Sequence, residues 1–368
     1  MQLNELTLRN FRNYENLELT LDPGVNLIIG NNAQGKTNLL EAIGYLGSGK
    51  SFRAQKTGEM VRFGEDFAEC AGSVTSQQRQ HQLRWVLFAS SKPRQIWRNG
   101  AKKKTAAEIA GVLQTVLFCP EDLMVLKAGA SARRKLGDQA LCQLRPNYEA
   151  ALAEYGRILE QKSRILKDRY ENPRLLDLLP DYNERLCQIG ALLISYRARF
   201  YEGLGKAAAN YHASFSGGAE EFRLDYKTVS TVADPFAPVA QLRQDLQNHL
   251  ESHSRAELET AQCLTGPHKD DFEVTLSDIS LKAYGSQGQT RTAAISLKLA
   301  QRELMGRESG EIPVLLLDDV LSELDPGRQD FLLNQITQGQ VFITCCEPGR
   351  FTKLGKTIEI SKGNIIEN

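Results

Sequence analysis

The stretch VNLIIGNNAQGKTNLLEAI, Val25 to Ile43, is the most informative part of the chain about its fold. It begins with a continuous apolar run, which is typical of a strand covered on both faces. It ends with apolar residues at helical spacing. Between them, GNNAQGKT at residues 30–37 fits the phosphate-loop pattern G-x-x-x-x-G-K-[ST]. Backbone N–H groups and the positive end of a helix dipole bind phosphate at such a turn, so the stretch predicts a nucleotide-binding α/β fold.

The same pattern occurs again in GYLGSGKS, residues 44–51. This copy begins inside the predicted helix and finishes past its C-terminal end, where unpaired carbonyl groups repel an anion. We therefore place the nucleotide at the first copy and interpret the second as a helix C-cap and exit loop. A chance glycine loop is the alternative for the first copy, and the strand and helix that flank it argue against that alternative.

Each position of the first copy has an expected role. Lys36 is expected to reach the β- and γ-phosphates, and Thr37 to ligate Mg²⁺. Gly30 and Gly35 permit the tight turn and a close approach of the backbone. The predicted nucleotide-binding residues are Gly30, Asn31, Asn32, Ala33, Gln34, Gly35, Lys36, Thr37 and Asn38.

An apolar strand that ends in two acids lies near the other end of the chain. It reads PVLLLDDVLSELD, residues 313–325, and matches the Walker B arrangement, in which a buried strand delivers a carboxylate to a phosphate loop. Asp318 is the expected partner of Mg²⁺, and Asp319 is placed to position or polarise the attacking water. A strand followed by an acidic turn is the alternative, which the phosphate loop in the same chain disfavours.

The region between these two motifs has a different character. From about residue 131 to 261 it is charged, with apolar residues three and four positions apart, which predicts long amphipathic helices. Strand patterns flank it on both sides. We expect an α/β body, residues 1–125 and 263–368, that is interrupted by an all-helical insertion, residues 126–262.

Composition narrows the class of protein. The chain has 368 residues, is 41% hydrophobic and 24% charged, and has a formal net charge of zero. This is typical of a soluble protein of about two domains, without an overall basic field. Its seven cysteines form no C-x-x-C pair, which favours reduced thiols. Since no apolar run has the length of a membrane span, we expect a cytoplasmic protein without a membrane partner.

A second helix N-terminus suited to binding an anion is predicted at AYGSQGQTR, residues 283–291. A serine hydroxyl, exposed N–H groups and a helix N-terminus all favour negative charge. The stretch resembles the LSGGQ signature of ABC ATPases, with a flexible loop and N-cap as the alternative. The resemblance implies that these residues bind the γ-phosphate of an ATP held by a second copy, in a head-to-tail dimer. They are Ser286, Gln287, Gly288 and Gln289, and Ser322 and Asp325 of SELD resemble the D-loop of the same interface.

The whole chain resembles the RecF family of ABC/SMC-like ATPases. The similar segments include LTLRNFRNYENLEL, IIGNNAQGKTNLLEAI, GPHKDDFEV, YGSQGQTRTAAISLKLA and LLLDDVLSELD, in the family's order. The resemblance implies an ABC-type P-loop head (lobe I) with an inserted helical lobe II, ATP and Mg²⁺ as cofactors, and slow DNA-stimulated ATP hydrolysis. It also implies a dimer on double-stranded DNA near single-strand gaps that works with RecO and RecR to load RecA, and that supports replication restart and SOS induction.

Several positions depart from the expected patterns. Ala128, Ala130 and Gly137 stand where the family more often has proline-rich and bulkier residues, at the expected start of the first helix of lobe II. Lys269 stands where the family usually has arginine, and lysine is a less rigid, non-bidentate substitute. Thr344, at the end of QVFIT, occupies the position of the ABC switch histidine, and we assign it a role in sensing the γ-phosphate.

DNA contacts are expected where cations gather, because the chain as a whole is neutral. The dipeptide Asn99-Gly100 in WRNGAKKKT is the strongest hairpin signal in the chain, and places three lysines at a tip. Such contacts would be to phosphates and blind to sequence, with a solvated surface as the alternative. The candidates are Lys102, Lys103, Lys104, Arg53, Arg133 and Arg134.

Three other interpretations fit the sequence less well. A P-loop kinase for a small molecule would need an acceptor pocket, for which the sequence gives no sign. An SMC-like head that only tethers DNA would have longer heptad helices. A metal site at His268, Asp270 and Asp271 lacks convergent ligand spacing, so a structural turn is favoured there.

Overall fold

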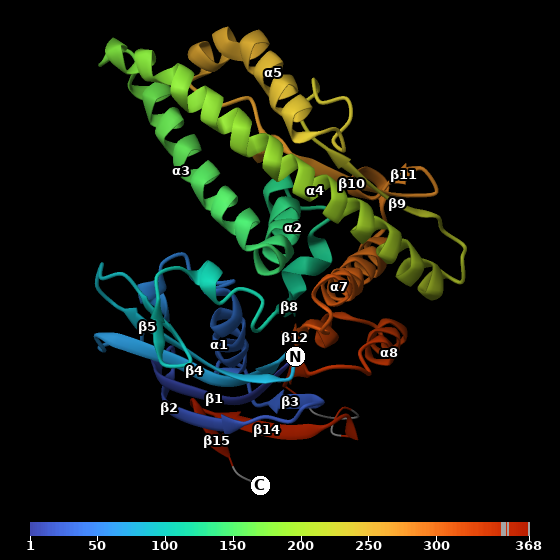
Figure 1. Cartoon of the computed structure of the whole chain (residues 1–368). Coiled ribbons are helices and arrows are strands. Elements are labelled where there is room, and N and C mark those ends of the chain that lie inside the picture. Colours follow the sequence, from blue (N-terminus) through green and yellow to red (C-terminus); the bar gives the residue numbers. More distant parts are fainter. Residues whose placement is uncertain (347–350, 352, 367–368) are drawn as a thin grey trace. The chain divides into compact units, whose positions relative to one another are not determined.

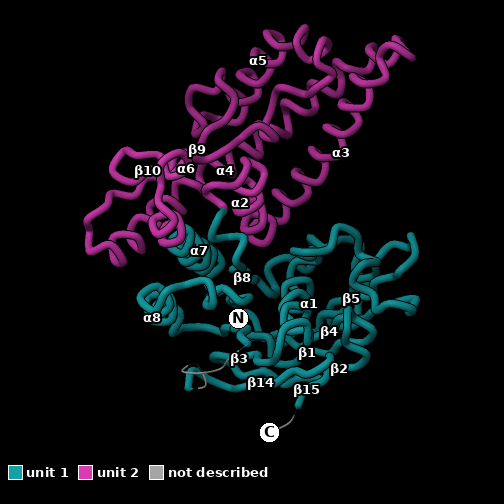
Figure 2. The backbone as a smooth tube through the Cα atoms, turned by 180° about the vertical axis from the view of Figure 1, so that it is seen from behind, with its two compact units in different colours: residues 1–124, 294–368 teal, residues 125–293 magenta. Residues whose placement is uncertain are grey.

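The fold is described from a computed structural model of the chain, which describes residues 1–346, 351 and 353–366. The chain divides into two compact units (Figure 2). The first unit, here called the head, consists of residues 1–124 and 294–368. The second, here called the insertion, consists of residues 125–293. Helix α7 (Gln287–Ser309) begins in the insertion and ends in the head.

The head contains a six-stranded sheet around the phosphate-loop strand β3 (Figure 1). Its order is β15-β14-β3-β13-β12-β8, with all neighbours parallel except β14 and β15. Because β13 lies between β3 and β12, the carboxyl ends of these three strands meet at one edge. The strands are β3 (Val25–Ile29), β8 (Thr115–Phe118), β12 (Val314–Leu317), β13 (Val341–Cys345), β14 (Lys356–Ser361) and β15 (Asn364–Ile366).

A second sheet of the head is antiparallel, with the order β2-β1-β4-β5-β6-β7. Buried and exposed residues alternate along β1 and β2, as expected of strands with one covered face. The predicted hairpin is confirmed: Asn99 and Gly100, with φ of 52° and 76°, join β6 to β7. The strands are β1 (Gln2–Phe11), β2 (Tyr14–Thr20), β4 (Phe67–Ser76), β5 (Arg79–Phe88), β6 (Gln95–Arg98) and β7 (Ala101–Lys103).

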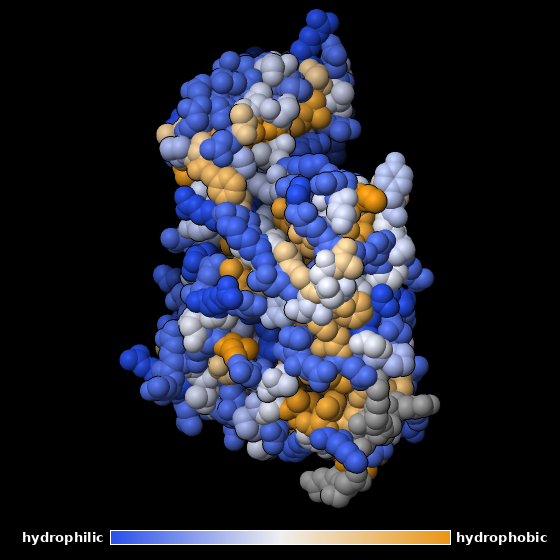
Figure 3. All heavy atoms as spheres, turned by 90° about the vertical axis from the view of Figure 1, so that its right-hand side faces the viewer, coloured by the Kyte–Doolittle hydropathy of each residue, from blue (hydrophilic) through white to orange (hydrophobic). Residues whose placement is uncertain are grey.

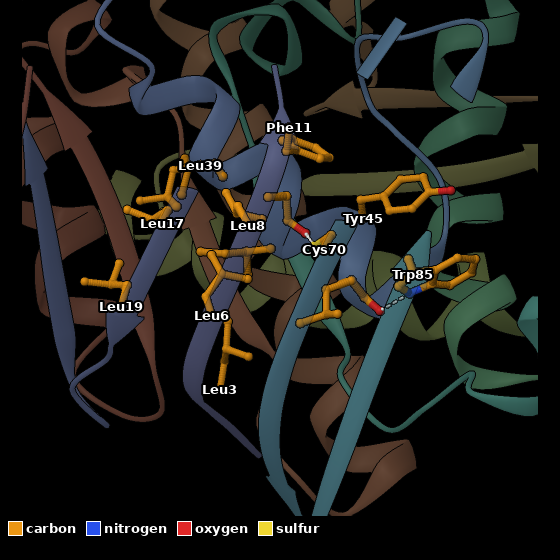
Figure 4. Packing of buried hydrophobic residues seen from close by; sticks show 14 of the residues in the cluster. Leu3, Leu6, Leu8, Phe11, Leu17, Leu19, Leu39, Tyr45, Cys70 and Trp85 are labelled. Carbon is orange, nitrogen blue, oxygen red and sulfur yellow. Dashed lines mark hydrogen bonds between the residues drawn. The ribbon is translucent and has the colours of Figure 1, made fainter. Parts of the chain in front are cut away.

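Helix α1 (Lys36–Ser48) packs against both sheets of the head. A Cβ added at Gly44 would lie 3.6 Å from Leu316 of β12, and one at Gly72 of β4 would lie 2.7 Å from Leu46. Trp85 Nε1 donates to Leu46 O at 3.0 Å, within the apolar cluster of Figure 4. Residues 39–47 of α1 are all buried, and this packing fixes the position of its first residue, Lys36.

The insertion is built on a long helical hairpin, α3 and α4 (Figure 1). It also contains a three-stranded sheet, β11-β10-β9, which corrects the prediction of an all-helical insertion. FRLDYK alternates as a strand, and its Leu224 packs against Gly205 of α4. The elements are α2 (Ala130–Leu144), α3 (Pro146–Asp168), α4 (Leu179–Ser216), β9 (Phe222–Lys227), α5 (Val239–Thr260), β10 (Asp271–Leu276), β11 (Ile279–Ser280) and α6 (Leu281–Tyr284).

Because of this sheet, one boundary between the insertion and the head differs from the predicted one. We expected the chain to return to the head at residue 263, whereas the compact insertion extends to Ala293. The reason is that β10 pairs with β9, so that the strand pattern after residue 263 completes the insertion. The boundary at its other end, between Met124 and Val125, lies one residue before the expected one.

The remaining elements are short. None of the helices in the described part of the chain has the length and apolar character to span a lipid bilayer. The face drawn in Figure 3 is largely hydrophilic, with apolar residues in separate patches. The remaining elements are helix α8 (Pro326–Gln335) and the 3-10 helices Thr57–Met60, Ala106–Glu108, Pro120–Met124, Pro173–Leu178, Pro267–Lys269 and Val320–Glu323.

Candidate nucleotide site

The phosphate loop joins β3 to α1, where the sequence places it. Its backbone is left-handed at Gly30 (φ 151°), Ala33 (φ 63°) and Gly35 (φ 120°). Gly35 is the N-cap of α1, and among the described residues no side chain caps this helix start. The N–H groups of the first turn therefore remain for a ligand, and the helix dipole favours an anion there.

Two of these positions have no room for a side chain. A Cβ added at Gly30 would lie 2.4 Å from Ile360 O, and one at Gly35 would lie 2.7 Å from Asn13 Nδ2. Because the first of these contacts is with backbone, no side-chain movement relieves it. Glycine is thus required by close packing as well as by the positive φ.

Neighbouring turns hold the loop by hydrogen bonds to its backbone. Asn13 Nδ2 donates to Gln34 O and the Tyr14 hydroxyl donates to Gly35 O, both at 2.9 Å. From the turn between β14 and β15, Gly363 N donates to Gln34 O at 3.1 Å. The sequence prediction missed these residues, although Asn13 and Tyr14 lie in the quoted segment LTLRNFRNYENLEL.

Lys36 lies at the centre of the loop. Its side chain is buried, and Nζ is 2.5 Å from Gly30 O and 3.1 Å from Asn31 O. Cys346 Sγ, just after β13, is 3.3 Å from the same Nζ. The ammonium group is therefore inside the curve of the loop, where a bound phosphate would meet it.

Asp318 meets the phosphate loop from the end of β12. Its Oδ1 accepts hydrogen bonds from Thr37 Oγ1 at 2.9 Å and from Thr344 Oγ1 at 3.0 Å. Burial raises the pKa of Asp318, and the two hydroxyl groups and the nearby Arg53 charge oppose this shift. The structure thus brings together the three residues that the sequence assigned to metal and γ-phosphate chemistry.

Asp319 has a left-handed backbone, with φ 53°, although it is not glycine. Such a conformation costs about 1–2 kcal/mol per residue. A hydrogen bond from Asp319 N to Thr344 Oγ1, at 2.8 Å, holds it. Thr344 therefore connects both acids: its hydroxyl donates to the carboxylate of Asp318 and accepts from the backbone of Asp319.

The residues present fit a magnesium ion. Thr37 and Asp318 supply a hydroxyl and a carboxylate oxygen, the ligand type that Mg²⁺ prefers. The described residues contain no group of three or more His, Cys, Asp or Glu side chains that could hold a metal. This is expected for Mg²⁺ held by one or two protein ligands together with phosphate oxygens.

The start of α7 differs from that of α1. Ser286 and Gln289 form a reciprocal capping box: Gln289 N donates to Ser286 Oγ at 3.2 Å, and Ser286 N donates to Gln289 Oε1 at 3.0 Å. Gln289 Nε2 also donates to Glu220 Oε1 at 2.7 Å. Ser286 and Gln287 are exposed on the insertion.

The D-loop residues already have local roles in the head. Ser322 Oγ donates to Asp319 O at 2.6 Å. Asp325 caps α8 by accepting from Arg328 N at 3.1 Å, and its hydrogen bonds with Arg328 lower its pKa. Both residues are exposed, so a partner remains able to reach them.

Some of the basic candidates for DNA contact are exposed, and others already interact with groups of the protein. In the hairpin, Lys102 and Lys104 are exposed, and Lys103 Nζ is 3.9 Å from Glu108 Oε2. Lys102 Nζ also lies 5.7 Å from the centre of the Trp97 ring, within cation–π distance. Arg53 Nη1 donates to Asn38 Oδ1 at 3.0 Å, next to the phosphate loop.

The structure does not support the prediction that Arg133 contacts DNA. Arg133 is 1% exposed and makes a bidentate pair with Asp271, at 2.6 and 2.8 Å. Its charge is neutralised inside the insertion, so it has no surface to offer to DNA. Arg134 is half-buried and donates to Asp270 O at 2.7 Å.

The GPHKDDF segment is a structural turn, as favoured from the sequence. His268 Nδ1 is 2.8 Å from the Tyr155 hydroxyl, and Nε2 is 3.0 Å from Cys263 O. Burial lowers the pKa of His268 to about 4, so the ring is neutral at physiological pH. Its two nitrogens are used within the insertion.

Comparison with known proteins agrees with the predicted resemblance. Residues 2–367 match the model of the RecF/RecN/SMC N terminal domain. The DNA replication and repair protein RecF of Agathobacter rectalis is 37% identical over 99% of both chains. RecF of Bacillus cereus is 37% identical over 99% of this chain and 98% of its own.

Solved structures confirm the predicted fold class. The recombination mediator protein RecF-ATPrS of the RecFOR pathway is 34% identical, covers 99% of this chain and 97% of its own, and has a TM-score of 0.91. RecF-ATP, from the same pathway, has a TM-score of 0.90 at 34% identity, covering 100% of this chain and 97% of its own. An Smc head bound to the C-winged helix domain of ScpA shares only the fold, with 17% identity and a TM-score of 0.59 over 100% of this chain and 97% of its own.

Proposed function

This chain belongs to the RecF family, and on that premise we propose that it is an ATP-driven DNA clamp. Two copies pair head to tail when each holds ATP, and hydrolysis separates them. One observation carries the proposal: the chain has two helix starts suited to phosphate, and that of α7 lies exposed on a different compact unit from that of α1. A second copy of the chain would bring both helix starts into use, because the α7 start of each copy would contact the nucleotide held at the α1 start of the other.

The nucleotide is held by residues 30–38 in this proposal. Lys36 binds the β- and γ-phosphates, and the uncapped first turn of α1 supplies N–H groups. Thr37 and Asp318 would hold Mg²⁺, which neutralises phosphate charge when bound. Asp319 orients the attacking water, and Thr344 holds Asp318 and Asp319 in register with the γ-phosphate.

The pairing contact is made by the start of α7. Ser286 Oγ accepts from Gln289 N, and a hydroxyl group donates at the same time as it accepts. Among the described residues we find no acceptor for its proton, so the proton is available for a γ-phosphate oxygen of the other copy. Ser322 and Asp325 lie exposed beyond Walker B and would contact the same interface.

DNA is the proposed target of the dimer. The names of the relatives, DNA replication and repair protein and recombination mediator protein, support this assignment. We propose sequence-independent binding to double-stranded and gapped DNA, work with RecO and RecR in loading RecA, and slow ATP hydrolysis that DNA stimulates. The exposed hairpin lysines are the proposed phosphate contacts.

Sedimentation with and without ATP and Mg²⁺ tests the proposal directly. We expect a monomer without ATP and a dimer with it, and faster release of ADP and phosphate when duplex DNA is added. No phosphorylated small molecule should form, which separates a clamp from a kinase. A mass that stays monomeric under every condition would contradict the proposed function.

The hairpin contribution is measured by the salt dependence of duplex binding. Each lost phosphate contact lowers the slope of log K against log salt by about one. Because Lys103 lies near Glu108, we expect the triple alanine variant at Lys102, Lys103 and Lys104 to lower the slope by about one to two. Lys56→Ala, at another exposed lysine of the head, is the control, and an unchanged slope in the triple variant removes the hairpin from the interface.

A further inference from the structure

We infer that Glu220 is a positioning residue for the signature turn: it holds Gln289, and through Gln289 the backbone of Ser286, in the conformation that receives a phosphate. Glu220 lies in the bend between α4 and β9, far from the signature in sequence. This inference rests on the proposed function, because it explains how the second anion site is kept ready.

The contact chain is continuous. Gln289 Nε2 donates to Glu220 Oε1 at 2.7 Å, while Gln289 Oε1 accepts from Ser286 N at 3.0 Å. The carboxylate therefore fixes which end of the Gln289 amide faces Ser286. With the amide reversed, an NH₂ group would face the Ser286 N–H, and the capping box would be lost.

Glu220 is itself held by a buried histidine. His212 Nε2 lies 2.9 Å from Glu220 Oε2, and the His212 side chain is fully buried in α4. Hydrogen bonds from Gln289 and His212 lower the pKa of Glu220, so it is an ionised acceptor at neutral pH. A hydrogen bond to a charged acceptor is shorter and stronger than one between neutral groups.

Burying His212 carries an energetic penalty that packing alone does not explain. In the described part of the chain, His212 Nδ1 is buried without a hydrogen-bond partner. A buried polar atom left unpaired costs about 1–3 kcal/mol, and an apolar side chain would avoid it. Such a cost is expected where a residue serves a site, here by orienting the carboxylate that orients the signature.

The neighbouring residue Glu221 provides a matched control. It is also an acid in the same bend, but its partner is Arg223 on the surface and it has no contact with Gln289. We expect Glu220→Ala to weaken ATP-dependent dimerisation about tenfold, equivalent to about 1.4 kcal/mol. The affinity of the monomer for ATP should not change, since the phosphate loop lies in the other compact unit.

The conservative variant separates positioning from folding. Glu220→Gln keeps an acceptor oxygen for Gln289 and should restore most of the dimerisation, whereas Glu221→Ala should behave as the native protein. Glu220→Ala combined with Gln289→Ala should cost less than the sum of the single changes, because both remove one contact. If Glu220→Ala dimerises like Glu221→Ala, the inference is wrong.

Hydrogen exchange in the nucleotide-free monomer tests the inference without any dimer. Glu220→Ala should raise the exchange rate of the Gln289 amide about tenfold, because the capping box opens more often. Exchange in α1 serves as the internal reference. Unchanged exchange at Gln289 overturns the inference, whereas a native protein that stays monomeric with ATP overturns the proposed function instead.

Discussion

The starts of α1 and α7, the two helix starts proposed to contact phosphate, are built in opposite ways. The start of α1 has glycine at its N-cap and no side-chain cap, so its backbone donors are left for a ligand. The start of α7 is closed by its own serine and glutamine, and this pair is braced by Glu220. The first is held from outside, by close packing and by hydrogen bonds from neighbouring turns to its backbone, and the second by hydrogen bonds among side chains of the insertion, which include its own cap.

This contrast suits a division of roles that we propose, in which the α1 start binds the nucleotide and the α7 start contacts the nucleotide of a second copy. Neighbouring turns and the carboxylate of Asp318 surround the α1 start, so we expect it to bind a nucleotide without a partner. The α7 start is closed by its own capping box and has a serine hydroxyl proton to offer, so we do not expect it to bind ATP alone. In the proposed dimer it would act only on a nucleotide held by the second copy.

The largest expected effect comes from removing the charge at the α1 start. Lys36→Met should weaken ATP binding about 100-fold or more, since a charge-assisted hydrogen bond contributes about 1.5–3 kcal/mol and Lys36 is proposed to contact both the β- and γ-phosphates. Dimerisation should be lost with it. Lys50→Met changes the lysine of the second phosphate-loop pattern and should bind ATP normally in a fluorescent-nucleotide titration. Equal losses in both variants would mean that the wrong copy was chosen.

Blocking the α7 start should impair dimerisation without impairing ATP binding by the monomer. Ser286→Arg places a bulky side chain at the exposed turn, so we expect dimerisation to weaken at least about tenfold while the monomer binds ATP normally. Ser131→Arg, an exposed serine in α2 of the same unit, adds the same charge as a control. A loss of monomer ATP affinity in Ser286→Arg would show that the two starts act within one copy.

Thr344→Val tests the link between the two acids. Valine keeps the shape of threonine but cannot donate to Asp318 or accept from Asp319. We expect ATP hydrolysis to fall about tenfold with ATP affinity unchanged, less than the roughly 100-fold or more for loss of an acid–base group itself, because Thr344 only positions the two acids. Thr344→Ser should restore the rate. A normal rate in the valine variant would leave the hydroxyl without a role in hydrolysis.

The smallest effect concerns stability in the absence of nucleotide. Burial raises the pKa of Asp318, so its ionised form is disfavoured in the folded state. Its contribution to stability is greatest below its unfolded pKa and decreases as the pH rises through the folded value. Asp318→Asn should therefore unfold at a slightly higher temperature at neutral pH, with a smaller difference in acid. A lower unfolding temperature at neutral pH would show that the carboxylate is needed for folding.

Local sequence patterns predicted the head well. The apolar strands, the glycine loop and the helix that follows are specified by residues adjacent in sequence, and Thr37 and Asp318 meet as expected. The likeness to solved RecF structures confirms this fold class. The role of Asn13 was missed because its bond to Gln34 O depends on how two distant turns pack.

The insertion was harder to predict, for a physical reason. FRLDYK stands among helices, and only its pairing with β10 makes it a strand. Arg133 lies in a basic run that resembles a surface, until folding brings Asp271 to its side chain. Glu220 and Gln289 have no shared pattern in the sequence, because a hydrogen bond between remote segments leaves no periodicity.

Helix α7 passes from one compact unit to the other between Ala293 and Ala294 without a break. Dividing the chain between Ala293 and Ala294 would therefore break a continuous helix. It would also expose buried apolar residues just after the break, such as Ile295 and Leu297. Neither part is suited to separate expression with those ends. Gene fusions or domain exchanges within this family should carry all 23 residues of the helix as one indivisible module.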